Sequence, residues 1–190
     1  FIGMVVWLLR LEQINISQIN IVGNSVVSGE VIHDIVSENL EGSYVFLIPR
    51  SNSLFFPERK IIRNIQETYL RINNVVITRE NFASVTVSVT EREPHALWCG
   101  ENFSLQQNEV GTCYFLDQSG YVYAKSPDIS GAVFFKYYGT LTAEDVQGRL
   151  DPIGKFFISP EYYHKINLFL DQLVRSGSVP IALARVVGLD

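Results

Sequence analysis

The feature that most constrains this chain is a strict two-residue alternation near its middle. Three valines alternate there with three hydroxyl-bearing residues: Val85, Val87 and Val89 with Thr86, Ser88 and Thr90. Successive side chains of a strand point to opposite faces, so the pattern predicts a strand with one buried and one solvated face. Such a strand needs other elements of the chain to cover its apolar side.

Two helices are predicted before this strand. Ser28 is a good N-cap, and apolar residues recur at helical spacing over residues 31–40. A second helix is expected to begin at Pro57, which suits the first helical position, and to bury an isoleucine-rich face.

Two further strands complete this region. One is expected over residues 14–22, and a short one over 75–77 is expected to follow a turn at Asn73 and Asn74. Together with the valine strand, the order becomes strand, helix, helix, strand, strand. Two helices on one face of a three-stranded sheet form a compact α+β domain.

The composition changes after Pro94, where short strands separated by glycines are predicted. They are expected over residues 96–99, 113–116, 121–123, 131–138 and 180–187. One long helix interrupts them: Ser159 is its cap, Pro160 is its first residue, and Gly177 follows its end. The second half is therefore predicted to be a β-rich domain with one long helix.

The chain opens with nine apolar residues, and Arg10 is the first charge. At 1.5 Å per residue, such a helix covers about half of a ~30 Å hydrocarbon core. We interpret residues 1–11 as the C-terminal part of a transmembrane helix. A core strand and the remnant of a signal peptide are the alternatives.

The charge and the missing motifs exclude several classes of function. The net charge is −5 and the basic residues are not gathered into one stripe, which argues against a nucleic-acid binder. The sequence contains no glycine-rich phosphate loop, no Gly-x-Ser-x-Gly and no paired metal-ligating histidines. We therefore predict a non-enzymatic protein with no catalytic, metal or cofactor-binding residues and no small-molecule substrate. An enzyme with a dispersed site is the alternative.

The two cysteines of the chain, Cys99 and Cys113, flank a loop of 13 residues that contains Gly100 and Gly111. This spacing suits cysteines that face each other across a hairpin. A disulfide is expected if the domain lies outside the cytoplasm, and two buried free thiols are expected in a reducing compartment.

Three short motifs, in this order, resemble those of the bacterial FtsQ/DivIB division proteins. They are Val22-Gly23-Asn24 after the first strand, Glu91-Arg92-Glu93-Pro94 between the two halves, and Asp117 followed by Gly120 in the β-rich half. Each motif also suits a role in defining the fold, as a tight turn, a strand end or a hairpin turn. Contact with partners is the alternative role.

The resemblance implies a domain plan and a cellular role. Residues 14–92 would form a POTRA domain, and 93–190 an FtsQ-type β-domain whose C-terminal strands are missing. The protein would be a single-pass scaffold in the bacterial cytoplasmic membrane, with both domains extracytoplasmic, at the division septum. Its partners would be membrane proteins of the FtsL and FtsB/DivIC type, which act with it on septal peptidoglycan synthesis.

Strand addition at a sheet edge is the binding mode that we expect. The candidate edges are a strand in the first domain (Val75, Val76, Ile77 and Thr78) and a strand near the end of the chain (Ile181, Leu183, Arg185 and Val187). The alternative function is a POTRA-type module of an outer-membrane assembly or export system. That alternative predicts tandem POTRA repeats upstream or a β-barrel downstream.

Overall fold

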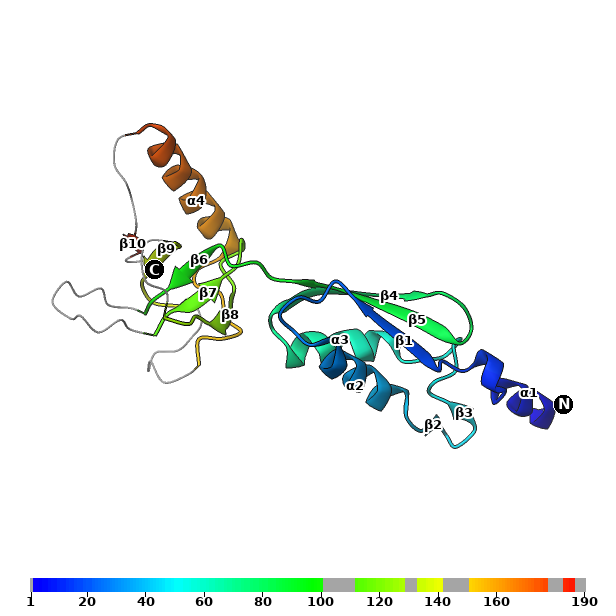
Figure 1. The fold of residues 1–190 in the computed structure, drawn as a ribbon. Helices are drawn as coiled ribbons and strands as arrows, with labels where there is room; N and C mark the ends of the chain where they lie inside the picture. The colour runs from blue at the N-terminus through cyan, green and yellow to red at the C-terminus, as the bar shows by residue number, and fades with distance from the viewer. Residues whose placement is uncertain (1, 101–111, 129–132, 142–150, 178–182, 187–190) are drawn as a thin grey trace. The chain divides into compact units, whose positions relative to one another are not determined.

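The computed structural model of the chain describes residues 2–100, 112–128, 133–141, 151–177 and 183–186. The protein is α+β and divides into two compact units, Phe1–Glu91 and Arg92–Asp190 (Figure 1). Each unit has its own hydrophobic core, so the two units are described separately.

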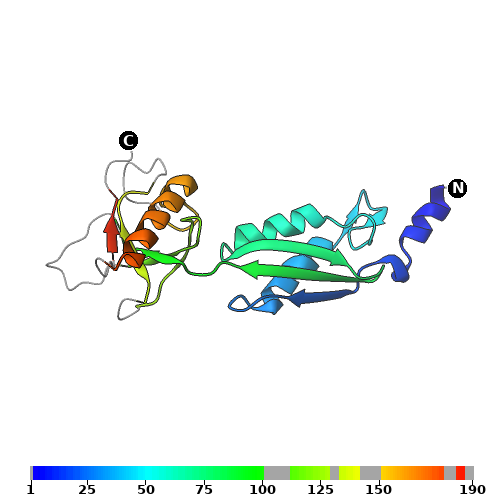
Figure 2. The same cartoon turned by 90° about the horizontal axis from the view of Figure 1, so that it is seen from above.

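The first unit contains a mixed three-stranded sheet and two long helices on one of its faces. Its sheet has the order β1-β5-β4, with β1 parallel and β4 antiparallel to β5. Figures 1 and 2 show α2 and α3 on the same face of this sheet. The elements are α1 (Ile2–Leu9), η1 (Glu12–Ile14), β1 (Gln18–Val22), α2 (Gly29–Leu40), β2 (Ser43–Tyr44), β3 (Ile48–Pro49), α3 (Glu58–Thr68), β4 (Ile72–Arg79) and β5 (Ser84–Glu91).

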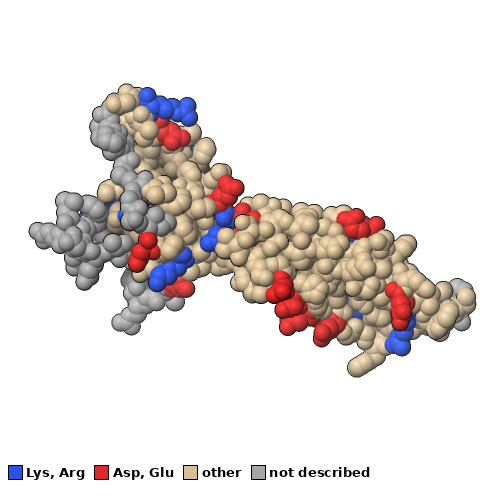
Figure 3. Space-filling model, viewed as in Figure 1, with Lys and Arg blue, Asp and Glu red and all other residues tan. Residues whose placement is uncertain are grey.

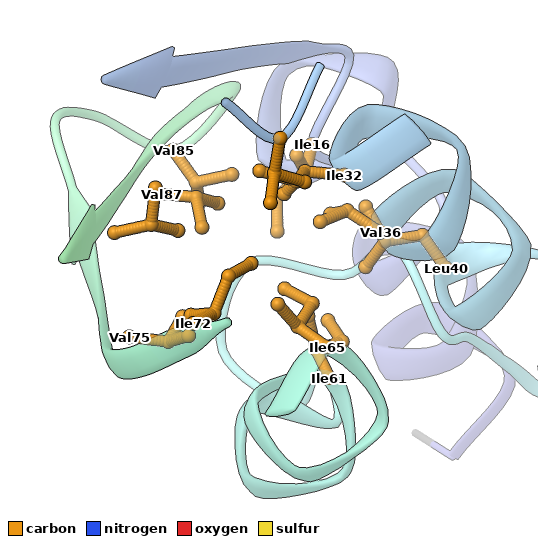
Figure 4. Close-up of a cluster of buried hydrophobic side chains, with 12 residues drawn as sticks. Ile16, Ile32, Val36, Leu40, Ile61, Ile65, Ile72, Val75, Val85 and Val87 are labelled. Atoms are coloured by element: carbon orange, nitrogen blue, oxygen red, sulfur yellow. The ribbon is translucent and has the colours of Figure 1, made fainter. Parts of the chain in front are cut away.

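The valine alternation forms the centre of the first core, as the sequence predicts. Strand β5 is the middle strand, and its three valines are each at most 4% exposed. Figure 4 shows the isoleucines of α3 and the aliphatic residues of α2 pointing toward the same space. The residues of this cluster that the helices contribute are Ile32, Val36, Leu40, Ile61 and Ile65. The prediction of Ser28 as the cap of α2 is confirmed, since its hydroxyl accepts the N–H of Glu30 at 3.2 Å.

Three predictions about element boundaries in the first unit are wrong. The first strand, expected over residues 14–22, begins only at Gln18, because Glu12–Ile14 forms a 3-10 helix. Asn73 and Asn74 do not form a turn but lie inside β4, because Ile72 is buried and already pairs with Glu91. A register shift between Ile72 and Asn74 accommodates the asparagines within the strand. Pro57 is the N-cap of α3, so the helix begins one residue later than expected.

Helix α1 is short and entirely apolar, with no charged residue in its eight positions. Among the described residues, no helix combines the length and the apolarity that crossing a bilayer requires.

The second unit contains a five-stranded sheet and one long helix. The sheet has the order β10-β9-β6-β7-β8, in which β9 is parallel to both β6 and β10. Strand β7 is antiparallel to β6 and β8. The elements are β6 (Ala96–Trp98), β7 (Tyr114–Leu116), β8 (Val122–Lys125), β9 (Phe135–Tyr138), α4 (Pro160–Arg175) and β10 (Leu183–Arg185).

Aromatic side chains fill the core beneath α4. The ring of Tyr137 lies 5.5 Å from the rings of both Phe157 and Tyr163, and all three residues are almost fully buried. The predicted start of α4 is confirmed, since the Ser159 hydroxyl accepts the N–H of Tyr162 and Pro160 is the first helical residue. Helix α4 contacts this core through Tyr163, Ile166 and Leu170.

A disulfide joins Cys99 and Cys113, with their Cα atoms 4.2 Å apart. It links the end of β6 to the start of β7. Backbone hydrogen bonds hold both ends in the sheet, because the Cys99 N–H donates to the Tyr137 carbonyl and the Cys113 carbonyl accepts from Ser126. The bond therefore joins the ends of two strands that are paired with each other.

Removing this disulfide is expected to destabilise the second unit alone. In the chain-entropy model, closing a loop of about 15 residues stabilises by roughly 3 kcal/mol. We expect the double substitution Cys99→Ala/Cys113→Ala to lower the free energy of unfolding of the second unit by about that amount. Urea denaturation measures the loss of stability, and hydrogen exchange shows in which unit it occurs. An equal loss of protection in β5 would contradict the prediction.

Gly23 is expected to be far less tolerant of alanine than Gly42. Both residues have positive φ, +82° and +81°, which costs an alanine about 1–2 kcal/mol. A Cβ on Gly23 would also lie 2.2 Å from the Val89 carbonyl oxygen, whereas Gly42 has open space around it. Gly23→Ala should therefore destabilise the first unit clearly more than Gly42→Ala. Equal melting temperatures for the two variants would show that the contact with β5 is unimportant.

Candidate protein-interaction site

The predicted edge segment of the first unit lies in β4, an outer strand of the three-stranded sheet. Val75 is buried beneath the helices, and Ile77 packs partly against the same core. Val76 and Thr78 point to the opposite face and are exposed. One side of the segment therefore packs against the core, and the other side faces solvent.

The hydrogen-bonding phase of β4 shows which backbone groups face away from β5. The N–H of Glu80 donates to the carbonyl of Ser84 at 3.1 Å at the end of this hairpin. Bonded and non-bonded pairs alternate along an antiparallel ladder, so the backbone groups of Val75, Ile77 and Arg79 point outward. These groups are oriented to pair with a further strand.

The predicted edge segment near the end of the chain contains β10, the outermost strand of the five-stranded sheet. The Val186 N–H donates to the Tyr138 carbonyl at 2.9 Å, so the backbone groups of Leu183 and Arg185 face away from β9. Ala184 packs toward the core between them. The other two predicted residues, Ile181 and Val187, lie outside the described residues.

The opposite edge of the five-stranded sheet is covered at the start of β8. Val122 of β8 donates to the Lys155 carbonyl and accepts from Gly154, and Gly120 accepts from the N–H of Phe157. Residues 154–157 therefore run beside residues 120–122, at the start of β8. At the other edge of this sheet, no element in the part of the chain that the structure describes pairs with the outside of β10.

Helix α4 exposes several large apolar side chains, which the sequence pattern alone does not reveal. Tyr163 is the one residue of this helix that is fully buried. Ile166 and Leu170 are partly buried against the same core as Ala184 of β10. The exposed apolar residues are Tyr162, Leu168, Phe169 and Val174, each more than half exposed. They are candidates for contact with another molecule.

The side chain of Glu91, the first residue of the second motif, binds the loop that follows the first motif, Val22-Gly23-Asn24. One oxygen of its carboxylate accepts the N–H groups of Ser25, Val26 and Val27 at 2.6, 2.9 and 2.9 Å. Asn24 holds the same loop by donating to the Val27 carbonyl at 3.0 Å. The end of β5 is thereby fixed to the loop that follows Val22 and Gly23 of the first motif.

These contacts determine how Glu91 titrates. Burial alone would raise its pKa, but the three backbone N–H groups and the charge of Arg71 hold the pKa of Glu91 below its usual value. The ionised form is therefore the one that the fold favours.

Within the second unit, an ion pair joins Arg92 of the second motif to Asp117 of the third. The Arg92 guanidinium forms an ion pair with Asp117 and lies 4.4 Å from the centre of the Tyr121 ring. The second carboxylate oxygen of Asp117 accepts the N–H groups of Ser119 and Tyr121 at 2.8 and 3.1 Å. Both charged side chains are less than 20% exposed, so this network orders the β7–β8 turn.

Gly120 and Pro94 complete the motif residues. Gly120 has φ +80°, and a Cβ there would lie 2.8 Å from the ring of Tyr163. Pro94 lies between β5 and β6, and the next residue, His95, donates its N–H to the Leu116 carbonyl. The motif residues thus define turns and connections, whereas the edge strands and α4 present the surfaces that another protein could contact.

The charge of Glu91 should make the stability of the first unit dependent on pH. A depressed folded-state pKa gives stability that is present above the unfolded value of about 4.3 and is lost as the pH falls through the lower folded value. We expect Glu91→Gln to lower the free energy of unfolding by about 1–2 kcal/mol at pH 7. The difference from the unsubstituted protein should shrink below pH 4.

The matched control is Glu38→Gln, which changes an exposed carboxylate of α2. It should leave the unfolding free energy nearly unchanged at both pH values. Urea denaturation at pH 7 and pH 3.5 measures both variants. A loss for Glu91→Gln that is the same at the two pH values would contradict the role assigned to the charge.

The described residues hold no group of three or more His, Cys, Asp or Glu side chains arranged to bind a metal ion. On the face shown in Figure 3, charged side chains form small separate groups. A scan against protein-family models and a search of curated proteins found no match to this chain.

Proposed function

We propose that this chain is a non-enzymatic scaffold of the bacterial cell-division machinery, of the FtsQ/DivIB type. It acts as a single-pass protein of the cytoplasmic membrane and presents its two units outside the cytoplasm. It recruits and regulates division partners of the FtsL and FtsB/DivIC type by adding their strands to its own sheets.

The architecture of the first unit supports this proposal. With the short β2–β3 pair set aside, its elements follow the order strand, helix, helix, strand, strand. Both helices cover one face of a three-stranded sheet, which is the arrangement that the resemblance to POTRA domains implies. The disulfide supports an extracytoplasmic location, because such bonds persist mainly in oxidising compartments.

The observation that carries the proposal is the outer edge of β10, which no described element covers. The outward backbone groups of Leu183 and Arg185 can hydrogen-bond to an added strand. In strand addition, the main chain supplies affinity and alternating side chains supply selectivity. Helix α4 packs Ile166 and Leu170 against the same core as Ala184 of β10, and its exposed apolar residues, such as Phe169, offer a partner additional apolar contact.

Proline at position 185 tests the edge directly. The Arg185 N–H faces away from β9, so Arg185→Pro removes an outward donor without removing a bond of the existing sheet. We expect this variant to bind an extracytoplasmic fragment of an FtsB/DivIC-type partner at least about tenfold more weakly, since hydrogen bonds and strand geometry are lost together. Arg185→Ala, which keeps the N–H, should bind within about twofold of the unsubstituted protein.

The same comparison at β4 separates the two candidate edges. Arg79→Pro and Arg79→Ala form an equivalent pair, because the backbone of Arg79 also points outward. Titration calorimetry with each partner fragment measures all four variants, and circular dichroism checks that each is folded. Unchanged binding by both proline variants would overturn strand addition, and the absence of binding by the unsubstituted protein would overturn the proposed partners.

A further inference from the structure

One end of the first unit exposes large apolar side chains on two neighbouring elements. At the tip of the β2–β3 hairpin, Val45 is 82% and Phe46 is 88% exposed, and Leu47 beside them is about half exposed. On α1, Met4 and Trp7 are 65% and 61% exposed. Monomeric proteins rarely gather such residues in one place without a binding role.

The backbone of the hairpin tip adopts a conformation that is unfavourable for the residues it contains. Val45 and Phe46 have φ values of +47° and +60°, in the left-handed region. For a β-branched or bulky residue this is a genuine outlier, and a glycine or asparagine would fit better. Strained residues of this kind cluster at functional sites. The sequence therefore places apolar side chains at two positions where local folding preferences oppose them.

Hydrogen bonds hold the hairpin tip against the end of α1. The guanidinium of Arg10 donates to the carbonyls of Phe46 and Leu47 at 2.6 and 3.1 Å. The Asn52 side chain donates to the Leu9 carbonyl at 2.9 Å. The two exposed apolar elements are thus linked, and the backbone carbonyls at the tip are paired with a protein donor.

Basic side chains lie beside this apolar surface. A surface hollow of about 530 Å³ is lined by the aromatic residues Tyr44 and Phe55 and by Arg59, Lys60 and Arg63 of α3. All three basic residues are exposed, and Glu58 is the acidic residue at the hollow. This local excess of positive charge stands out in a chain whose net charge is −5.

We propose that this end of the first unit docks onto an anionic phospholipid bilayer. The tip residues Val45, Phe46 and Leu47 enter the interfacial region beside α1, and the basic side chains of α3 contact lipid phosphates in the hollow. The inference goes beyond the proposed function, because it concerns the hairpin and α3 and requires none of the partner contacts.

The composition of the surface favours a bilayer over a protein partner. Interfacial binding strength follows the apolar area that enters the membrane plus the attraction between basic residues and anionic lipids. Here aromatic and aliphatic side chains lie at the tip, and the cations flank them. Lipid docking would also orient the first unit at the membrane surface, since α1 and the hairpin would enter it together.

The double substitution Val45→Asn/Phe46→Asn tests the role of the tip while sparing the fold. Asparagine tolerates positive φ, so the variant should melt at the same temperature as the unsubstituted protein or higher. Losing two apolar side chains should lower the partition coefficient onto vesicles of phosphatidylcholine and phosphatidylglycerol by about tenfold. Vesicle flotation of the 190-residue chain measures this, and α1 is unchanged in every variant.

The matched control is Val26→Asn. Val26 is 67% exposed but follows the far end of β1, away from the hairpin. This variant should bind vesicles as the unsubstituted protein does. A tenfold loss for Val26→Asn as well would show that the effect is not specific to the tip.

The basic residues are tested by Arg59→Gln/Lys60→Gln/Arg63→Gln. This variant should lose the preference for anionic over purely phosphatidylcholine vesicles and should lose most of the sensitivity of binding to salt. Its binding to phosphatidylcholine alone should not change. An unchanged preference for anionic vesicles would overturn the assignment of the hollow to lipid phosphates.

A fluorescence measurement distinguishes a lipid bilayer from a protein as the binding partner of this surface. It uses the variant Phe46→Trp and vesicles that contain brominated lipids. Quenching beyond that of the unsubstituted protein places position 46 in the bilayer. No additional quenching, together with vesicle binding unaffected by Val45→Asn/Phe46→Asn, would overturn the proposal. Partner binding measured on the same variants stays separate, because Arg185 lies in the second unit.

Discussion

The burial of one face of β5 is the constraint on which the first unit depends. This strand lies between β1 and β4, so its backbone pairs on both sides while its valines face α2 and α3. A shift by one residue would turn every valine toward solvent, which fixes the register of the whole sheet. Glu91, at the end of the same strand, then binds the loop before α2 through three N–H groups. One strand thus determines the sheet, the helix positions and the loop.

The second unit is organised differently, around a disulfide and an aromatic core. Its strands are only three or four residues long, so its sheet gains less from pairing than the first one does. The covalent bond at the β6–β7 connection and the cluster around Tyr137 and Tyr163 compensate for these short strands. Among the described residues, the segment 154–157 covers the β8 edge at its start, and the β10 edge has no covering element.

The sequence predicted features that depend on neighbouring residues, such as helix caps, but not contacts between residues far apart in the chain. Ser28 and Ser159 cap their helices through neighbouring residues, and the only two cysteines of the chain had a single possible intrachain pairing. The turn expected at Asn73 and Asn74 failed because tertiary pairing of Ile72 overrode a local preference. The bonds of Glu91 to Ser25 through Val27 span more than 60 residues and leave no periodic signal. The exposure of Phe169 depended on how closely α4 approaches the sheet, which an apolar pattern does not specify.

The residues that carry the resemblance and the residues that offer surfaces are different sets. Gly23, Glu91, Asp117 and Gly120 have contacts that only the folded chain provides, so selection for the fold is sufficient to account for them. The hairpin tip is the opposite case, because Val45 and Phe46 oppose the local backbone preference and bury little surface within the unit. Where a sequence departs from local consistency without a gain in the core, a functional surface is the physical explanation to seek. By that reasoning, the tip is better evidence for a binding surface than any of the motifs.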